Sequence, residues 1–193
     1  MKIAIDGREL TGDATGVGRY VENLCQVWSS ESFAHSHDIV LYTHTPVPKP
    51  IPNKQAIGAN ISYVTLPGRG DIWWEQTRPA LAINRDNIDV FFGPAYSLPI
   101  GTTVPTVVTL HDLSFFRRPD WFGLKEGLRR RTLTQHAARI ANRIITVSEF
   151  GAENFDNAEG WCFVNSFGKL INVDWLTKSF NRNLNSYINV FNV

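Results

Sequence analysis

The first 28 residues read MKIAIDGRELTGDATGVGRYVENLCQVW and combine a short apolar run with a helical pattern. The run Lys2–Asp6 has the largely apolar character of a strand that is buried on both faces. Further along, apolar residues recur at intervals of three and four and predict one helix face: Val17, Tyr20, Val21, Leu24, Val27 and Trp28. A strand followed by an amphipathic helix is the repeating unit of a parallel α/β sheet.

The same alternation continues along the chain. Six strand candidates are separated by helical patterns: Lys2–Asp6, Ile39–Thr43, Ile61–Thr65, Asp89–Phe92, Thr106–Leu110 and Arg143–Val147. We expect the first, fifth and sixth at the centre of the sheet because they are continuous apolar runs. The chain is therefore predicted to adopt an α/β fold, a three-layer Rossmann-like domain with a mostly parallel sheet.

Two further helices are predicted, over roughly Trp74–Ile83 and Leu124–Asn142. Pro79 lies inside the first of them, so we expect a kink or a late start. The second should turn five apolar residues toward the sheet: Leu128, Leu133, Ala137, Ile140 and Ala141. Its arginines at 129–131 favour a solvated helix face over a phosphate-binding patch.

The composition excludes several classes of protein. The chain is 43% hydrophobic and 19% charged with a net charge of +1, which is typical neither of a disordered chain nor of a nucleic-acid-binding protein. The N-terminus lacks a secretory signal, and prolines interrupt the long uncharged stretch Val90–His111. We therefore expect a cytoplasmic protein, with contact to the inner face of a membrane left open. Cys25 and Cys162 have no metal or redox spacing and are expected to be free thiols.

A glycine-rich turn follows the first strand and contains Gly16 and Gly18. Such a turn at the start of a helix lets backbone N–H groups approach an anion. A dinucleotide-binding fingerprint fails because Val21 occupies the place of the third glycine, and no Lys-Ser/Thr pair follows to make a P-loop. A purely structural tight turn is an equally good interpretation.

The fifth strand ends in His111 and Asp112, where ligands of α/β sheets are expected. His111 could bind a hydroxyl or transfer a proton while Asp112 orients it. Alternatively, Asp112 caps the next turn and His111 packs against the sheet. Ser148 follows the sixth strand as a helix N-cap candidate. The histidines and carboxylates show no metal-ligand spacing, so no metal site is predicted.

The order and spacing of these segments resemble the N-terminal half of family 4 glycosyltransferases, which have the two-domain GT-B fold. The resemblance covers residues 1–155 and rests on five segments: Asp6-Gly7-Arg8, Gly16-Val17-Gly18-Arg19-Tyr20, Trp74-Glu75-Gln76, Val108–Leu113 and Arg143–Phe150. It implies an acceptor-side Rossmann-like domain of enzymes that build bacterial surface polysaccharides, often as mannosyltransferases.

The resemblance also implies roles for particular residues. The glycine turn would bind the donor diphosphate and His111 the donor sugar, with Asp112 as its catalytic partner. The remaining assignments are Gly16, Val17, Gly18 and Ser148 to donor binding, and Arg8, Glu75 and Tyr96 to acceptor binding or support.

The implied reaction is retaining transfer of a sugar from a nucleoside diphosphate sugar to a glycan or lipid-linked acceptor, without a metal or other cofactor. The catalysis of this reaction would rest on electrostatic stabilisation of the leaving diphosphate. The alternative is a non-catalytic module, derived from that domain, that binds a glycan or a partner.

Residues 156–193 have a different composition. From Ala152 onward there are nine Asn and no Pro, whereas residues 1–151 hold six Asn and all ten Pro. The family pattern stops near Phe155, and residues 156–193 do not show the pattern of a donor-binding second domain. We expect a frameshifted or truncated tail or, second, an enzyme whose C-terminal half is a separate chain, and in either case no activity from this chain alone. The tail is expected to add no strand to the core of the sheet.

Overall fold

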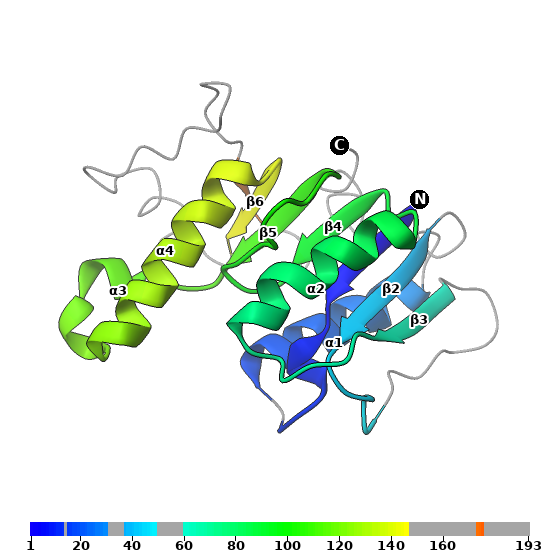
Figure 1. Ribbon diagram of the computed structural model, residues 1–193, viewed down its shortest axis with the longest axis horizontal. Coiled ribbons are helices and arrows are strands. Elements are labelled where there is room, and N and C mark those ends of the chain that lie inside the picture. Colours follow the sequence, from blue (N-terminus) through cyan, green and yellow to red (C-terminus); the bar gives the residue numbers. More distant parts are fainter. Residues whose placement is uncertain (14, 31–36, 50–59, 147–172, 176–193) are drawn as a thin grey trace. The chain divides into compact units, whose positions relative to one another are not determined.

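The computed structural model describes residues 1–13, 15–30, 37–49, 60–146 and 173–175 (Figure 1). The chain divides into two compact units. The first unit comprises Met1–Pro94 and Pro99–Pro105, and the second comprises Ala95–Leu98 and Thr106–Val193.

The first unit contains a parallel sheet in which β1 lies between β2 and β4, and β3 pairs with the other edge of β2. Its strands are β1 Lys2–Asp6, β2 Asp38–Thr43, β3 Asn60–Thr65 and β4 Val90–Gly93. In register, Ile3 is opposite Ile39 on one side and Val90 on the other. The central position expected for the first strand is confirmed within this unit.

The helices of the first unit are η1 Arg8–Leu10, α1 Gly16–Ser30 and α2 Ile72–Arg85. Figure 1 shows α1 and α2 on opposite faces of the sheet. Right-handed crossovers require this, because the chain moves one way from β1 to β2 and the other way from β3 to β4. The result is the predicted three-layer arrangement.

Aromatic residues of α1 and β4 make part of the core of the first unit. The rings of Tyr20 and Trp28 each lie with their centroids 6.4 Å from the ring of Phe92. Trp28 and Phe92 are both 1% exposed. Cys25 of α1 is a buried free thiol whose pKa burial raises to about 12, whereas Cys162 lies outside the described residues.

α2 begins earlier than its proline suggested. Asp71 caps it by accepting a hydrogen bond from the Trp74 N–H at 3.1 Å, and the helix starts at Ile72. Asp in the N-cap position satisfies backbone donors of the first turn, which fixes the start locally. The late start expected from Pro79 is therefore wrong, and this proline is buried inside the helix.

The second unit contains β5, β6 and β7, in which β6 pairs in parallel with both neighbours. Its elements are β5 Thr106–Leu110, α3 Ser114–Arg117, η3 Pro119–Trp121, α4 Leu124–Ile140, β6 Arg143–Thr146 and β7 Val173–Trp175. The six predicted strands are thus confirmed within one residue at each described end. β7 comes from the tail and lies at the edge of the strand order, while the other residues of 156–193 lie outside the described ranges.

α4 packs differently along its length. Leu133, Ala137 and Ala141 are buried as expected, and Ile140 is half-buried. Leu128 is 59% exposed, so its expected place against the sheet is wrong. The first turns of α4 lie beside α3 rather than over strands, as Figure 1 shows, which leaves this side chain without a sheet to cover.

None of the helices in the described ranges combines the length and the apolar character that crossing a bilayer demands.

Candidate functional site

The glycine turn of the first unit forms the N-terminus of α1. Thr15 precedes the helix, and its hydroxyl oxygen accepts a hydrogen bond from the Gly18 N–H at 2.9 Å. This is N-capping by Thr, and its sequence signal is a Thr just before the first helical residue. The glycines alone did not predict this cap. The cap orders the turn that carries Gly16 and Gly18.

The two glycines of this turn have different structural needs. A Cβ at Gly18 would lie 2.6 Å from the backbone carbonyl oxygen of Glu9, so close packing against η1 excludes a side chain there. A Cβ at Gly16 would meet nothing within 4 Å, and among the described residues only Gly70 and Gly101 are glycines with positive φ. Close packing therefore explains Gly18, whereas neither packing nor backbone conformation explains Gly16.

Arg8, Asp6 and Glu75 form a buried ion cluster in the first unit. The Arg8 Nε donates to the two Asp6 oxygens at 3.0 and 2.9 Å, and its Nη1 donates to Glu75 Oε2 at 2.7 Å. The three side chains are 14%, 11% and 5% exposed, respectively. One guanidinium thus joins the end of β1 to the first turns of α2.

The surroundings of this buried ion cluster keep Arg8 charged. Burial acts to lower the pKa of Arg8, but the charges and hydrogen bonds of Asp6 and Glu75 raise it above its usual value. The guanidinium carbon also lies 5.7 Å from the ring centroid of Trp74. The Glu75 Oε1 atom and the side-chain amide of Gln76 are buried without a hydrogen-bond partner among the described residues. These contacts are typical of a supporting role for Arg8.

His111 and Asp112 follow β5 in the second unit. His111 is half-buried and Asp112 is exposed. The Asp112 carboxylate accepts hydrogen bonds from the backbone N–H of Ser114, at 2.7 Å, and from its hydroxyl. Asp112 therefore holds the start of α3, as the structural alternative expected.

Tyr96 belongs to the second unit and contacts α4. Its hydroxyl oxygen accepts a hydrogen bond from Arg129 Nη2 at 2.9 Å. The guanidinium carbons of Arg129 and Arg130 lie 5.9 and 5.4 Å from its ring centroid. Tyr96 is thus a packing partner of the arginine run.

The arginine run itself is paired rather than simply solvated. Glu126 accepts hydrogen bonds from Arg129 Nε and Nη2, at 2.9 and 2.8 Å, and from Arg130 Nε at 2.6 Å. These bonds lower the pKa of Glu126 to about 2. We call Glu126, Arg129 and Arg130 the surface ion cluster. Its signal in the sequence is the spacing of three and four residues between the glutamate and the arginines. The sequence analysis considered only the arginines and therefore did not predict the cluster.

The predicted site residues are distributed over both units. Gly16, Val17 and Gly18 lie with Arg8 and Glu75 in the first unit, whereas His111, Asp112 and Tyr96 lie in the second. Ser148 falls outside the described residues. Within the parts of the chain that the structure describes, no three His, Cys, Asp or Glu residues are grouped as metal ligands would be.

Comparison with known proteins identifies the family. No curated protein matches this chain. Among solved structures, UGT2 of Phytolacca americana, complexed with UDP-2-fluoro-glucose and pterostilbene, matches with a TM-score of 0.46 and 11% identity. The match covers 82% of this chain and 50% of that one, so the chain spans about half the length of that protein. The family model described as Glycosyltransferase Family 4 matches residues 14–160. The chain therefore belongs to Glycosyltransferase Family 4.

Proposed function

We propose that the chain contributes the acceptor-side half of a retaining GT-B glycosyltransferase. The donor would be a nucleoside diphosphate sugar, with mannose as the expected sugar. The acceptor would be a glycan or a lipid-linked saccharide in the synthesis of a surface polysaccharide, at the cytoplasmic face of a membrane. Family membership over residues 14–160 supports the reaction class.

The observation that carries the proposal is the free space at Gly16. Neither packing nor a positive φ requires glycine at this position, which begins α1 ten residues after the end of β1. A helix N-terminus presents backbone N–H groups and the positive end of the helix dipole. Glycine allows an anionic ligand to come close to these groups, which fits the diphosphate of the donor.

His111 is the proposed contact to the donor sugar. A half-buried histidine just after a strand can donate a hydrogen bond to a sugar hydroxyl while solvent still reaches the site. Asp112 would act by holding the turn into α3, through its two hydrogen bonds to Ser114. The chemistry would rest on electrostatic stabilisation of the leaving diphosphate.

Arg8 and Glu75 are proposed as support for the acceptor side of the site. The guanidinium of Arg8 is already shared between Asp6 and Glu75. It would therefore position the β1 end and α2 rather than bind the acceptor. Tyr96 would have the same kind of role for α4, through its hydrogen bond with Arg129.

The test is nucleotide-sugar binding by NMR titration, with Gly16→Val compared against Gly123→Val. Both glycines lie at the start of a helix, and a Cβ at either position meets nothing within 4 Å. We expect millimolar donor binding, because a helix N-terminus and a few side chains provide the contacts. Gly16→Val should abolish it and Gly123→Val should not.

Two results would contradict the proposal. One is equal donor binding by the wild type and Gly16→Val. The other is glycan binding with no response to any nucleoside diphosphate sugar, which would favour the non-catalytic module. His111→Ala tests the sugar contact separately, because it should weaken binding of the nucleotide sugar but not of the nucleoside diphosphate.

A further inference from the structure

We propose that the first turns of α2 hold a binding site for a neutral saccharide, formed by the buried amide of Gln76 and the ring of Trp73. Gln76 is 5% exposed, and neither its Oε1 nor its Nε2 has a hydrogen-bond partner in the described part of the chain. Exchanging the two amide atoms would not change this, since both are unpartnered. A buried amide without partners costs free energy. A ligand that hydrogen-bonds to both atoms would offset that cost.

The neighbouring Glu75 shows what distinguishes Gln76. The Oε1 of Glu75 is also buried without a partner, but its Oε2 accepts a hydrogen bond from Arg8 Nη1 at 2.7 Å. That bond fixes Glu75 in the buried ion cluster. In Gln76 the backbone carbonyl accepts a hydrogen bond from the Ile100 N–H at 3.1 Å, while the side chain has none. The fold thus uses the backbone of Gln76 and leaves its side-chain amide available.

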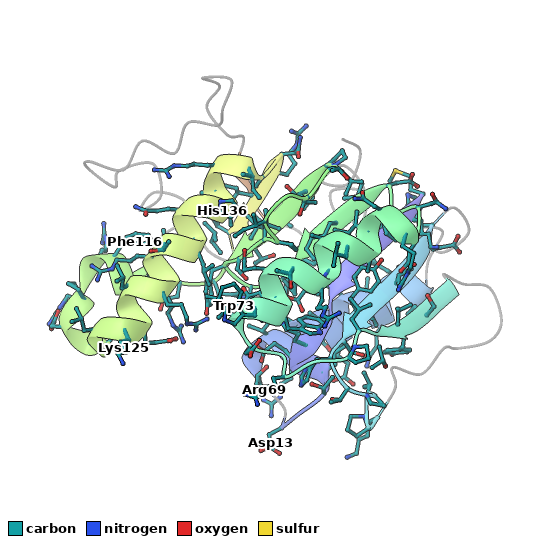
Figure 2. The ribbon with its side chains drawn as sticks, viewed as in Figure 1. Asp13, Arg69, Trp73, Phe116, Lys125 and His136 are labelled. Carbon is teal, nitrogen blue, oxygen red and sulfur yellow. The ribbon has the colours of Figure 1, made fainter. Side chains whose placement is uncertain are left out.

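Trp73 lies one turn before Gln76 on the same side of α2, and Figure 2 shows it near the start of this helix. Long helical side chains lean toward the N-terminus, so the amide of Gln76 lies toward Trp73. Trp73 is 76% exposed, and Ile100, held beside Gln76 by its backbone bond, is 60% exposed. Exposed side chains change rotamer within nanoseconds. Their movement can therefore uncover the amide without a change in the backbone.

The chemistry of these two side chains identifies the class of ligand. A side-chain amide combines a hydrogen-bond donor with an acceptor and carries no charge, which matches neighbouring hydroxyl groups. The indole ring adds a flat apolar surface, which fits the C–H face of a sugar ring. Residues 69–85 contain three Arg and two acidic residues, a net charge of only +1, so little charge is available to attract an ion. A neutral saccharide is therefore the ligand that fits.

The place of the site in the fold favours the acceptor saccharide. Arg8 joins the first turns of α2 to the end of β1. Ligands of open α/β sheets bind beyond the carboxyl ends of the strands, and β1 ends there. Naming the saccharide as the acceptor rests on the proposed function, whereas the binding site itself rests on Gln76 and Trp73.

The first test is saccharide binding by the full chain, measured by saturation-transfer NMR with mannobiose, lactose and cellobiose. We expect at least one of these neutral disaccharides to bind with a millimolar dissociation constant. Trp73→Leu keeps an apolar side chain but removes the flat ring, and should weaken binding at least about tenfold. Trp121→Leu is the matched control, because Trp121 is 65% exposed and belongs to the second unit. It should leave binding unchanged.

Gln76→Leu separates a binding role from a structural one. Leucine is similar in size to glutamine and needs no hydrogen bonds, so replacing an unpartnered buried amide removes a cost to the folded state. The midpoint of urea denaturation should therefore stay the same or rise, while disaccharide binding weakens at least about fivefold. Gln26→Leu, at an exposed glutamine of α1, is the control and should leave binding unchanged.

Several results would overturn the inference. They are no binding of any of the three disaccharides, full binding by Trp73→Leu or Gln76→Leu, and a Gln76→Leu protein less stable than the wild type. The last would mean that the amide is hydrogen-bonded inside the protein through a water molecule. Self-association that Trp73→Leu abolishes, measured by sedimentation velocity, would also overturn it, because the surface would then be an interface between copies.

The outcomes for this site and for the proposed function are distinguishable. Nucleotide-sugar binding without disaccharide binding would contradict the saccharide site and leave the proposed function standing. Disaccharide binding that depends on Trp73 and Gln76, without nucleotide-sugar binding, would support the site and contradict the proposed function.

Discussion

Two ion clusters in this molecule contain the same chemical groups and differ in their exposure to water. In the buried ion cluster of the first unit, Arg8 joins Asp6 and Glu75, and the side chains are 5–14% exposed. In the surface ion cluster of the second unit, Glu126 joins Arg129 and Arg130, and the side chains are 32–41% exposed. Both clusters also have a guanidinium group near an aromatic ring: Arg8 lies near Trp74, and Arg129 lies near Tyr96.

The difference in exposure determines what each cluster does. Removing one partner of a buried pair leaves a charge without water or a counter-ion, which is costly. Water screens an exposed pair, so such a pair contributes little to stability. We therefore infer that the buried ion cluster is essential to the fold of the first unit, while the surface ion cluster mainly orients the arginines of α4.

The largest expected effect is that of Arg8→Ala. It leaves Asp6 and Glu75 buried without their counter-ion and should lower the free energy of unfolding by about 3–5 kcal/mol. Urea denaturation monitored by circular dichroism measures this. The matched variant Arg129→Ala should lower it by less than about 1 kcal/mol. Equal losses would show that burial is not what separates the clusters.

Arg8→Lys tests the geometry of the buried ion cluster with its charge retained. A lysine ammonium cannot form the paired hydrogen bonds to Asp6 and also reach Glu75, so we expect a loss of about 2 kcal/mol. Arg129→Lys in the surface ion cluster should cost about 0.5 kcal/mol or less. The same denaturation experiment compares the two. A fully stable Arg8→Lys protein would mean that charge alone is sufficient.

Glu126→Gln tests the surface ion cluster through pH. The pKa of Glu126 is lowered to about 2 in the folded protein, below the value of about 4.3 in the unfolded chain. The stability that ionised Glu126 contributes is therefore fully present above pH about 4.3 and is lost as the pH falls through about 2. At neutral pH the variant should be less stable by under about 1 kcal/mol, because the Glu126 side chain is 41% exposed and water screens its ion pairs. Denaturation from about pH 5 to about pH 2 should show this difference shrinking; a difference that grows on acidification would contradict it.

Tyr96→Phe should have the smallest effect. The change removes the hydroxyl that accepts from Arg129 and keeps the ring beside the two guanidinium groups. We expect a loss of about 0.5 kcal/mol, since the remaining polar partner, the Arg129 guanidinium, can turn to water. Thermal unfolding measures it. A loss comparable with that of Arg8→Lys would place Tyr96 among the structurally essential residues.

Much of the fold was predictable from local patterns. Continuous apolar runs such as Thr106–Leu110 predicted the strands, and the spacing from Val17 to Trp28 predicted α1. The start of α2 was predicted two residues late, at Trp74, because the N-cap signal of Asp71 was not used. The signal is local, so the start of this helix could have been predicted from the sequence.

The site was less predictable than the fold. The sequence alone identified the glycine turn and the chemistry that glycines permit. It did not distinguish Gly16 from Gly18, because only the packed structure brings the Glu9 carbonyl oxygen within 2.6 Å of a Cβ at Gly18. In the same way, the sequence left Asp112 between orienting His111 and capping the next turn, and only the structure shows its hydrogen bonds to Ser114.

By itself, the sequence determined the order of strands and helices, because apolar periodicity and capping act over a few residues. Tertiary structure decided which charges meet: Arg8 and Glu75 are 67 positions apart, and their contact requires β1 and α2 to be packed together. It also decided that Leu128 is exposed to water. The spacing of the apolar residues predicted that Leu128 covers the sheet, but the first turns of α4 extend past the strands. The physical reason is that burial depends on every neighbour in space, whereas a sequence pattern reports only the neighbours along the chain.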